Sequence, residues 1–395
     1  MKLPRNRKPR RAAAVIAIAL TGALAAVTLP SHAATGSAGS SGGAEHGYIV
    51  TLKPGTRAAS EAGRDLADKY GARISLTYRA ALNGYAVKAT SAEADRLAAD
   101  PSVAAISRDA TVRVSDRQIN PPSWGLDRVD QRNLPLNRSY TYPRSAGAGA
   151  TVYVIDTGVR TSHRDFGGRA RSGFDFVDND PIAQDGNGHG THVAGTVAGT
   201  RYGVAKKARI VAVRVLNNQG MGTISQVIAG VDYVTRTARK PAVANMSLGG
   251  GANAALDAAV RRSIASGVTY SVAAGNSGLP ASGFSPARVP QALTVGASSI
   301  VDARAPFSNY GLSLDLFAPG VGITSASNAS DTASATLSGT SMAAPHVAGA
   351  AAVYLGQRPS STPARVAQVL TDRAVRGKIT SPGLGSPNRL LQVKP

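Results

Sequence analysis

The chain has 395 residues, of which 43% are hydrophobic, with no cysteine and a formal net charge of +21. This composition favours a folded core over a disordered chain, and the lack of cysteine excludes disulfides, thiolate metal sites and cysteine nucleophiles. Residues 119–395 hold 27 basic and 14 acidic residues, scattered and with little aromatic interleaving. We therefore expect a solvated basic surface with weak affinity for anionic polymers and no specific nucleic-acid recognition.

The first 33 residues have the pattern of a secretory signal peptide. Six basic residues precede an apolar run over residues 12–29, and Ser31-His32-Ala33 follows. We expect cleavage after Ala33. The pair Arg10-Arg11 also allows twin-arginine export, but the usual bulky apolar residues do not follow it, which favours the general secretory route. No later stretch has the roughly 20 apolar residues of a membrane span, so the product is predicted to be secreted, extracellular and free of the membrane.

Residues 34–118 predict a small separate domain. After a Gly, Ser and Ala-rich leader, the pattern predicts strands at 48–52, 74–78, 85–88 and 103–114, and helices at 58–70 and 92–99. The order β-α-β-β-α-β is that of the ferredoxin-like α+β unit. This segment has no His, Cys or acidic cluster that resembles a site, so it is predicted to be a folding or binding module.

Residues 119–395 predict a larger α/β domain, which begins at the Pro- and Gly-containing segment 120–125. Apolar strands are expected at 151–155, 210–216, 242–248, 268–273, 293–296 and 314–317. Helices are expected at 189–198, 225–237, 254–266, 341–355 and 363–375. Near-continuous apolar strands between helices predict a doubly wound, mostly parallel sheet with helices on both faces, and such sheets bind ligands at the carboxyl ends of their strands.

The segment Gly-Thr-Ser-Met-Ala-Ala-Pro-His at 339–346 places a serine at the start of a helix. Proline is tolerated in a helix only near its beginning, so Pro345 predicts a helix that begins close to Ser341. A hydroxyl there lies beside unpaired backbone donors and the positive end of the helix dipole. Ser341 is therefore a candidate nucleophile.

Two further motifs supply partners for that serine. Asp156 ends a buried strand, and His189 leads a glycine-rich loop into a helix. An imidazole whose tautomer is fixed by a carboxylate can take the proton of a serine hydroxyl. Asn276 follows another strand end, and its amide could share the stabilisation of an oxyanion with the Ser341 backbone N–H.

Other interpretations of these motifs are weaker. Asp-Thr-Gly at 156–158 also occurs in aspartic proteases, but they need a second such motif and the chain has none. His189 and His192 could ligate zinc, yet no glutamate or cysteine completes a site. Ser341 could be only a helix cap in an inactive homologue, and the protein could instead coat anionic polymers.

With these motifs, residues 119–395 resemble the subtilisin-like serine proteases, most nearly their proteinase K-like branch. The resemblance rests on Asp-Thr-Gly at 156–158, His-Gly-Thr-His-Val-Ala-Gly at 189–195 and the Ser341 motif. It implies a monomeric serine endopeptidase of broad specificity that acts on extracellular proteins without an organic cofactor. Asp156 would orient the base His189, Ser341 would attack, and Asn276 would stabilise the oxyanion.

The resemblance also implies a substrate cleft and an inhibitor. Substrate would lie as a strand between Ser247-Leu248-Gly249-Gly250 and Gly220-Met221-Gly222, with Ala273, Ala274 and Gly275 as walls of the primary pocket. Small walls without a buried acid favour apolar or aromatic residues before the cut. Residues 34–118 resemble the inhibitory propeptides of this family, which assist folding, occupy the cleft and are cut off, here between about 114 and 120.

A calcium site is implied as well. In proteinase K-like enzymes an aspartate in the position of Asp315 joins backbone carbonyls, here those of Pro290 and Ala292, and oxygen-only ligation suits calcium. The alternative is that Asp315 is an ordinary strand acid. The disulfides common in this branch are absent, and the segment after Gly199 lacks the Asn-rich calcium loop of bacterial subtilisins.

Overall fold

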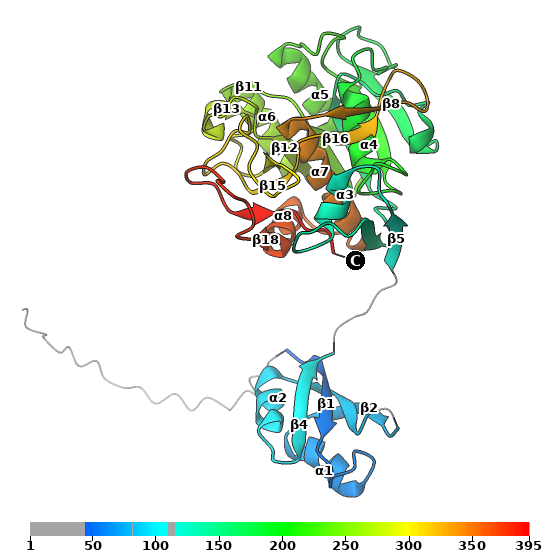
Figure 1. The fold of residues 1–395 in the computed structure, drawn as a ribbon, viewed down its shortest axis with the longest axis vertical. Helices are drawn as coiled ribbons and strands as arrows, with labels where there is room; N and C mark the ends of the chain where they lie inside the picture. The colour runs from blue at the N-terminus through cyan, green and yellow to red at the C-terminus, as the bar shows by residue number, and fades with distance from the viewer. Residues whose placement is uncertain (1–43, 81, 110–114, 395) are drawn as a thin grey trace, which may run out of the picture. The chain divides into compact units, whose positions relative to one another are not determined.

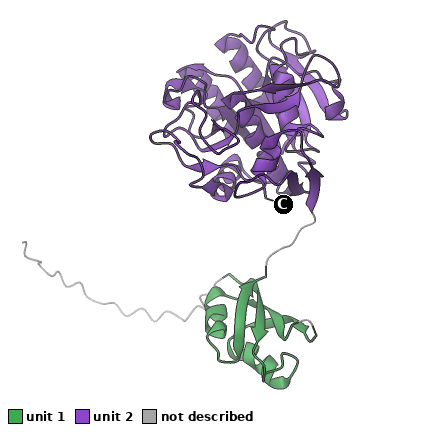
Figure 2. Cartoon of the chain, in the orientation of Figure 1, with its two compact units in different colours: residues 1–111 green, residues 112–395 purple. Residues whose placement is uncertain are grey.

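The computed structural model describes residues 44–80, 82–109 and 115–394. It divides into two compact units, residues 1–111 and 112–395 (Figure 2). The expected signal peptide lies outside the described residues. Over the described ranges, no helix combines the length and apolar character that a bilayer crossing needs.

Unit 1 is a four-stranded antiparallel sheet with two helices, in the chain order that the sequence predicts. Its elements are β1 (His46–Leu52), α1 (Glu61–Lys69), β2 (Arg73–Tyr78), β3 (Gly84–Ala89), α2 (Ser91–Ala98) and β4 (Val103–Arg108). The strand order β2-β3-β1-β4 is that of a ferredoxin-like sheet. Each helix begins at a polar cap: Ser60 accepts from the N–H of Gly63, and Thr90 forms a capping box with Glu93. Ser60 explains why α1 begins later than the predicted residue 58.

Unit 2 is built on a nine-stranded sheet in the order β18-β19-β15-β14-β12-β10-β7-β9-β8. All neighbouring pairs are parallel except β18 and β19. The strands are β7 (Thr151–Asp156), β8 (Ala170–Asp175), β9 (Arg209–Arg214), β10 (Ala242–Met246), β12 (Val268–Ala273), β14 (Leu293–Ser298), β15 (Leu316–Pro319), β18 (Val375–Arg376) and β19 (Arg389–Leu390). Short pairs at the periphery are β5 (Ser115–Ile119) with β6 (Ser139–Pro143), β11 (Gly250–Gly251) with β13 (Phe284–Ser285), and β16 (Ile323–Ala326) with β17 (Ser334–Leu337).

Helices cover both faces of this sheet (Figure 1). They are α3 (Trp124–Val129), α4 (His189–Ala198), α5 (Ile224–Thr237), α6 (Ala254–Ala265), α7 (Thr340–Gln357) and α8 (Pro363–Arg373), with one-turn 3-10 helices at Arg164–Phe166 and Ala281–Gly283. Strand β7 is buried throughout, and its alternate side chains enter different cores. Val152 and Val154 pack with α4 and α7, whereas Tyr153 and Ile155 pack with α5 and α6. The doubly wound α/β prediction is therefore confirmed.

Helix α7 runs through the core and begins at Thr340, one residue before the predicted start. Pro345 is its sixth residue and has no N–H to give to the carbonyl of Ser341, four residues earlier. That carbonyl instead accepts from Ser247 Oγ at 2.7 Å. A side chain from the end of β10 thus replaces the helical bond that proline removes.

The structure differs from the sequence predictions mainly in short and peripheral elements. The pattern missed helix α3 and the strands of the short peripheral pairs. Within the nine-stranded sheet it missed β8, β18 and β19, and β15 begins two residues later than the predicted residue 314. β8 is an edge strand with an interior Gly173, and β18 and β19 have two residues each, so none shows a clear hydrophobic period. The strand predicted at 103–114 ends at Arg108, and residues 110–114 lie outside the described residues.

Candidate active site

Asp156 lies at the carboxyl end of β7, where the chain order of the sheet reverses. After β7 the chain forms β8 and β9 on one side, and then returns to β10 on the other. Such a switch point opens a crevice beyond the strand ends. The Asp156 side chain is fully buried, and its Oδ1 accepts from the N–H of Thr157 at 2.8 Å and from His189 Nδ1 at 2.7 Å.

His189 is the first residue of α4, and its side chain remains 26% exposed. A carboxylate only accepts, so the proton of the neutral ring lies on Nδ1 and Nε2 is free to accept. Burial acts to lower the pKa of His189. The charge and hydrogen bond of Asp156, with a smaller contribution from Asp185, outweigh it and raise the pKa above the ordinary 6.5. The ring therefore accepts a proton more readily than an unperturbed imidazole does.

Ser341, the second residue of α7, is tied to Ser247 by two hydrogen bonds. Its Oγ donates to the carbonyl of Ser247 at 3.0 Å, and its own carbonyl accepts from Ser247 Oγ. Asn245 donates to the same Ser247 hydroxyl at 2.8 Å. Free enzymes often hold catalytic hydroxyls away from the base until substrate binds. Ser341 is therefore fixed in position, with a hydroxyl that can rotate.

Asn276 and the start of α7 present two donors to one empty space. Asn276 Oδ1 accepts from the N–H and Oγ1 of Thr340 at 2.8 and 2.9 Å, which leaves the Nδ2 amide free. A Cβ placed on Gly339 would lie 3.5 Å from Asn276 Nδ2 and 3.6 Å from Ser341 N. Because Gly339 has no side chain, an oxygen atom could approach both donors.

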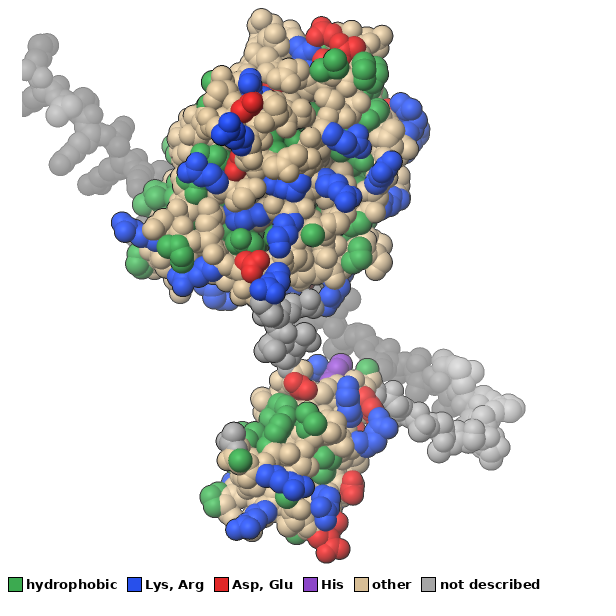
Figure 3. Space-filling view, turned by 90° about the vertical axis from the view of Figure 1, so that its right-hand side faces the viewer, with side chains coloured by type: hydrophobic (Ala, Val, Ile, Leu, Met, Phe, Trp, Pro, Cys, Tyr) green, Lys and Arg blue, Asp and Glu red, His purple; other side chains and the backbone are tan. Residues whose placement is uncertain are grey.

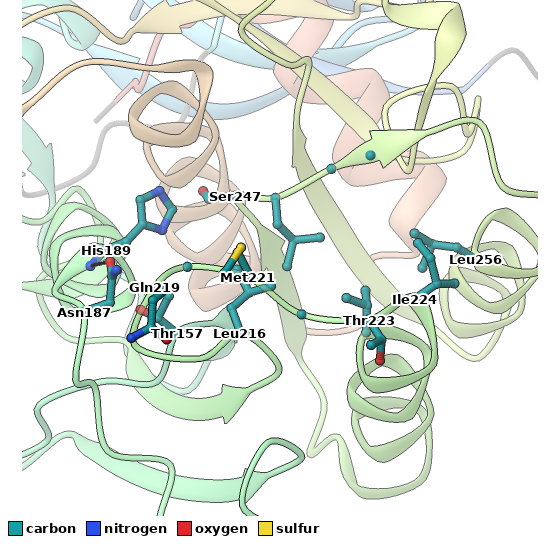
Figure 4. Close-up of a pocket in the computed structure, with 16 residues that line it drawn as sticks. Thr157, Asn187, His189, Leu216, Gln219, Met221, Thr223, Ile224, Ser247 and Leu256 are labelled. Atoms are coloured by element: carbon teal, nitrogen blue, oxygen red, sulfur yellow. Dashed lines mark hydrogen bonds between the residues drawn. The ribbon is translucent and has the colours of Figure 1, made fainter.

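A cavity of about 670 Å³ leads away from His189 (Figure 4). Its lining includes Gly220, Met221 and Gly222 on one segment and Ser247, Leu248 and Gly249 on another. A second cavity of about 290 Å³ is lined by Ala273, Ala274, Gly275, Asn276 and Ser341, and it shares Leu248 and Gly249 with the first. The residues predicted to bind substrate therefore line two adjoining hollows beside the candidate catalytic residues.

Comparison with known proteins decides the family. Residues 147–389 match the subtilase family, and residues 47–115 match peptidase inhibitor I9. The extracellular serine proteinase of Thermus sp. (strain Rt41A) is 54% identical over 81% of this chain and 78% of its own length. The alkaline serine exoprotease A of Vibrio alginolyticus is 48% identical over 82% of this chain and 60% of its own length. The chain belongs to the subtilase family.

Comparison with solved structures supports the same family. A crystal structure of a cold-adapted subtilisin-like serine proteinase is 55% identical, has a TM-score of 0.67, and is matched over 68% of this chain and 97% of its own. This subtilase is accordingly a serine protease of the Asp-His-Ser type, with an inhibitor-like domain before the catalytic domain. The resemblance of the chain to subtilisin-like serine proteases with an inhibitory propeptide is confirmed.

Two further histidines, His192 and His346, are buried and hydrogen-bonded to backbone carbonyls. His192 contacts the carbonyl of Ile323 at 2.9 Å and His346 that of Met342 at 2.8 Å, and burial lowers the pKa of both to about 4. His189 and His192 therefore bond different groups, the Asp156 carboxylate and the carbonyl of Ile323. Within the described residues, no three His, Cys, Asp or Glu side chains are placed to share a metal ion.

The residues predicted to supply oxygen ligands to calcium lie near the starts of the neighbouring strands β14 and β15. Ala292 directly precedes β14, and Asp315 directly precedes β15 and accepts from the N–H of Thr294 at 2.8 Å. Burial raises the pKa of Asp315 to about 6. Pro290 and Ala292 come shortly before Thr294, the residue that bonds Asp315. A half-buried carboxylate and peptide carbonyls form a hard-oxygen donor set, which fits calcium in kind.

Two oxygens that sequence reasoning missed lie just after α3. Asp130 Oδ1 and Gln131 Oε1 are buried and have no hydrogen-bond partner among the described residues. Burial raises the pKa of Asp130 to about 6. Buried acceptors are nearly always satisfied, so this pair also suits a cation. No sequence signal distinguished these residues from ordinary surface polar groups.

Proposed function

We propose that this subtilase is a secreted, self-processing endopeptidase of broad specificity that degrades extracellular proteins. The observation that carries the proposal is the 2.7 Å hydrogen bond from His189 Nδ1 to Asp156, in a cleft whose wall residue Ser247 is bonded to Ser341. The test is whether the secreted protein hydrolyses casein and loses this activity when Ser341 is replaced.

In this proposal His189 Nε2 takes the proton of Ser341 Oγ as that oxygen attacks the peptide carbonyl. Asp156 keeps the proton on Nδ1 and stabilises the imidazolium that forms. The tetrahedral oxyanion receives hydrogen bonds from Asn276 Nδ2 and Ser341 N. His189 then protonates the leaving amine, and water repeats the sequence to release the acid.

Broad specificity is supported by the nature of the cleft walls. The segments 220–222 and 247–249 offer mainly backbone groups, so an extended peptide would be held by strand-like hydrogen bonds. Ala273 and Ala274 line the second cavity with methyl groups, and no Asp or Glu lines it. An apolar or aromatic residue before the cut is the expected preference.

The inhibitor-like domain supports synthesis as a precursor. Its match to peptidase inhibitor I9 ends at residue 115, near the cut that we place between about 114 and 120. We place the signal peptide at 1–33, the propeptide at 34–118 and the catalytic domain at 119–395. The relative named as an extracellular proteinase supports secretion, and the mature enzyme is proposed to act as a monomer.

Replacing Asn276 with alanine is expected to lower kcat by about 100- to 1000-fold with little change in KM. This decrease in kcat is the one found when a single oxyanion donor is removed from an enzyme of this family. Steady-state hydrolysis of a peptide p-nitroanilide measures it. Asn276→Asp keeps an acceptor for Thr340 but removes the amide, so it should be equally impaired. A near-normal kcat in both variants would exclude Asn276 as an oxyanion donor.

We also propose structural calcium, held by Asp315 with the carbonyls of Pro290 and Ala292, and a further cation at Asp130 and Gln131. A ligand at 100 times its Kd stabilises a fold by about 2.7 kcal/mol. For a domain of this size, each kcal/mol changes Tm by about 2–4 °C. Chelation is therefore expected to lower the Tm of the inhibited wild-type enzyme by about 5–10 °C for each site that it empties.

Calorimetry with and without chelator measures this shift, and added calcium should reverse it. Asp315→Asn should begin at a lower Tm and lose part of the response, and Asp130→Asn should lose the rest. Asp372→Asn, an exposed control on α8, should respond as the wild type does. An identical wild-type Tm with and without chelator would contradict both sites.

A further inference from the structure

A further cavity, separate from the two beside the candidate catalytic residues, lies at the amino end of the parallel sheet. Its volume is about 420 Å³, and Arg169, Arg171, Arg209 and Arg239 line it around Thr151 and Tyr153. We call it the arginine hollow. No aspartate or glutamate is among its lining residues. Figure 3 shows more Lys and Arg than acidic side chains on one face of this unit. The four other cavities found among the described residues are each lined by fewer than four Lys or Arg residues.

Strand register brings these arginines together. Thr151 pairs with Arg209 and Tyr153 with Val211 on β7 and β9, and Val211 also pairs with Arg171 on β8. Paired residues point to the same face of a parallel sheet, and alternate residues share it. The side chains of Arg171 and Arg209 therefore project from one face of adjacent strands.

Further hydrogen bonds hold the rim of the hollow. The Arg169 guanidinium donates to the carbonyls of Ala198, Ala208 and Asp165 and to Thr200 Oγ1, so it is fixed in place and contributes charge rather than free donors. The backbone N–H of Arg239 donates to the Tyr153 hydroxyl at 3.1 Å, which anchors the fourth arginine at the end of α5.

Carboxylates among the described residues compensate only a small part of the positive charge of the hollow. None of its four arginines forms an ion pair with any described residue. Asp165 is the acid that acts on Arg169, and Lys206 shares it. The carboxyl end of α5 contributes only about half a negative charge. The exposed guanidinium groups of Arg209 and Arg239 also have no hydrogen-bond partner among the described residues.

We propose that the arginine hollow binds a multiply charged oxyanion, phosphate or sulfate, either free or as an ester group on a polymer. Guanidinium groups match the oxygens of such anions with paired hydrogen bonds. The hollow lies beside Thr151, the first residue of β7, and Asp156 is the last residue of that strand. Five residue steps of about 3.3 Å each place the hollow about 16 Å from the Asp156 carboxylate. An anion bound at that distance would leave the cleft open, so a protease held on an anionic polymer would remain active.

The test compares two charge-matched double variants of the mature enzyme inactivated with a sulfonyl fluoride. Arg209→Gln with Arg239→Gln removes two arginines of the hollow. Arg261→Gln with Arg262→Gln removes two exposed arginines on α6 and is the control. Calorimetric titration with inorganic phosphate at constant ionic strength tests the free anion, and salt elution from immobilised heparin tests sulfate esters on a polymer. Peptide hydrolysis before inactivation confirms that each variant folds.

We expect the hollow variant to bind phosphate at least about tenfold more weakly than the wild type, and the control to bind normally. Loss of heparin retention in the hollow variant alone, without phosphate binding by the wild type, would support the polymer ester as the ligand. Equal losses in both variants, or no loss in either, would overturn the proposal and leave only general basic charge.

Discussion

Replacing Ser341 with alanine is expected to lower kcat for casein and peptide hydrolysis by about a million-fold. The magnitude is the loss found when the nucleophile is removed from enzymes of this family. In our proposal the same hydroxyl cuts the propeptide, so the variant should also accumulate as the precursor. Casein hydrolysis, product size and N-terminal sequencing of the secreted protein measure both effects and locate the junction.

The matched control is Ser338→Ala, which changes an exposed serine three residues earlier. It should yield mature enzyme with nearly normal kcat. Adding a trace of wild-type protease to the Ser341→Ala precursor should remove the propeptide, which shows that the junction is intact. If Ser341→Ala hydrolysed casein normally, Ser341 would not be the nucleophile. A mature terminus without added enzyme would show that another protease performs the cut.

Asp156→Asn is expected to lower kcat by about 10,000-fold, the size known for this change in a serine-protease triad. An amide can direct its NH2 group to His189 Nδ1, which favours the tautomer whose Nε2 carries the proton and cannot accept from Ser341. The pH profile of kcat/KM gives a second measurement. The base acts in its neutral form, and Asp156 raises the pKa of His189, so wild-type activity should fall to half its plateau at a pH above 6.5.

In Asp156→Asn the carboxylate no longer raises the pKa of His189. The acid limb of the residual activity should therefore move to lower pH. Asp372→Asn provides the control, since it makes the same chemical change at an exposed site on α8. Its kcat and its acid limb should match those of the wild type. Near-normal turnover by Asp156→Asn, with an unchanged acid limb, would contradict the role of Asp156.

The sequence predicted the elements that carry strong local signals. The apolar run at 268–273 and the glycine-led helix at 189–198 coincide with β12 and α4. Pro345 placed the start of α7 within one residue. These signals are local because sheet burial, helix starts and proline geometry depend on only a few neighbouring residues.

Features that depend on distant segments were not predictable. Edge strand β8 exists because β9 provides its hydrogen-bond partners, not because residues 170–175 have a strand pattern. The unpaired oxygens of Asp130 and Gln131 are visible only after every nearby donor is assigned. The arginine hollow likewise depends on the register of three strands.

Pro345 has a mechanical consequence for the cleft. The carbonyl of Ser341 that proline leaves without a helical donor is bonded to Ser247, which in turn accepts from the Ser341 hydroxyl. One wall of the substrate cleft and the first turn of α7 are therefore coupled as one body. If thermal motion widens or narrows the cleft, we expect Ser341 to move with that wall. In the proposed mechanism this would preserve the spacing between Ser341 Oγ and a peptide bound along Ser247.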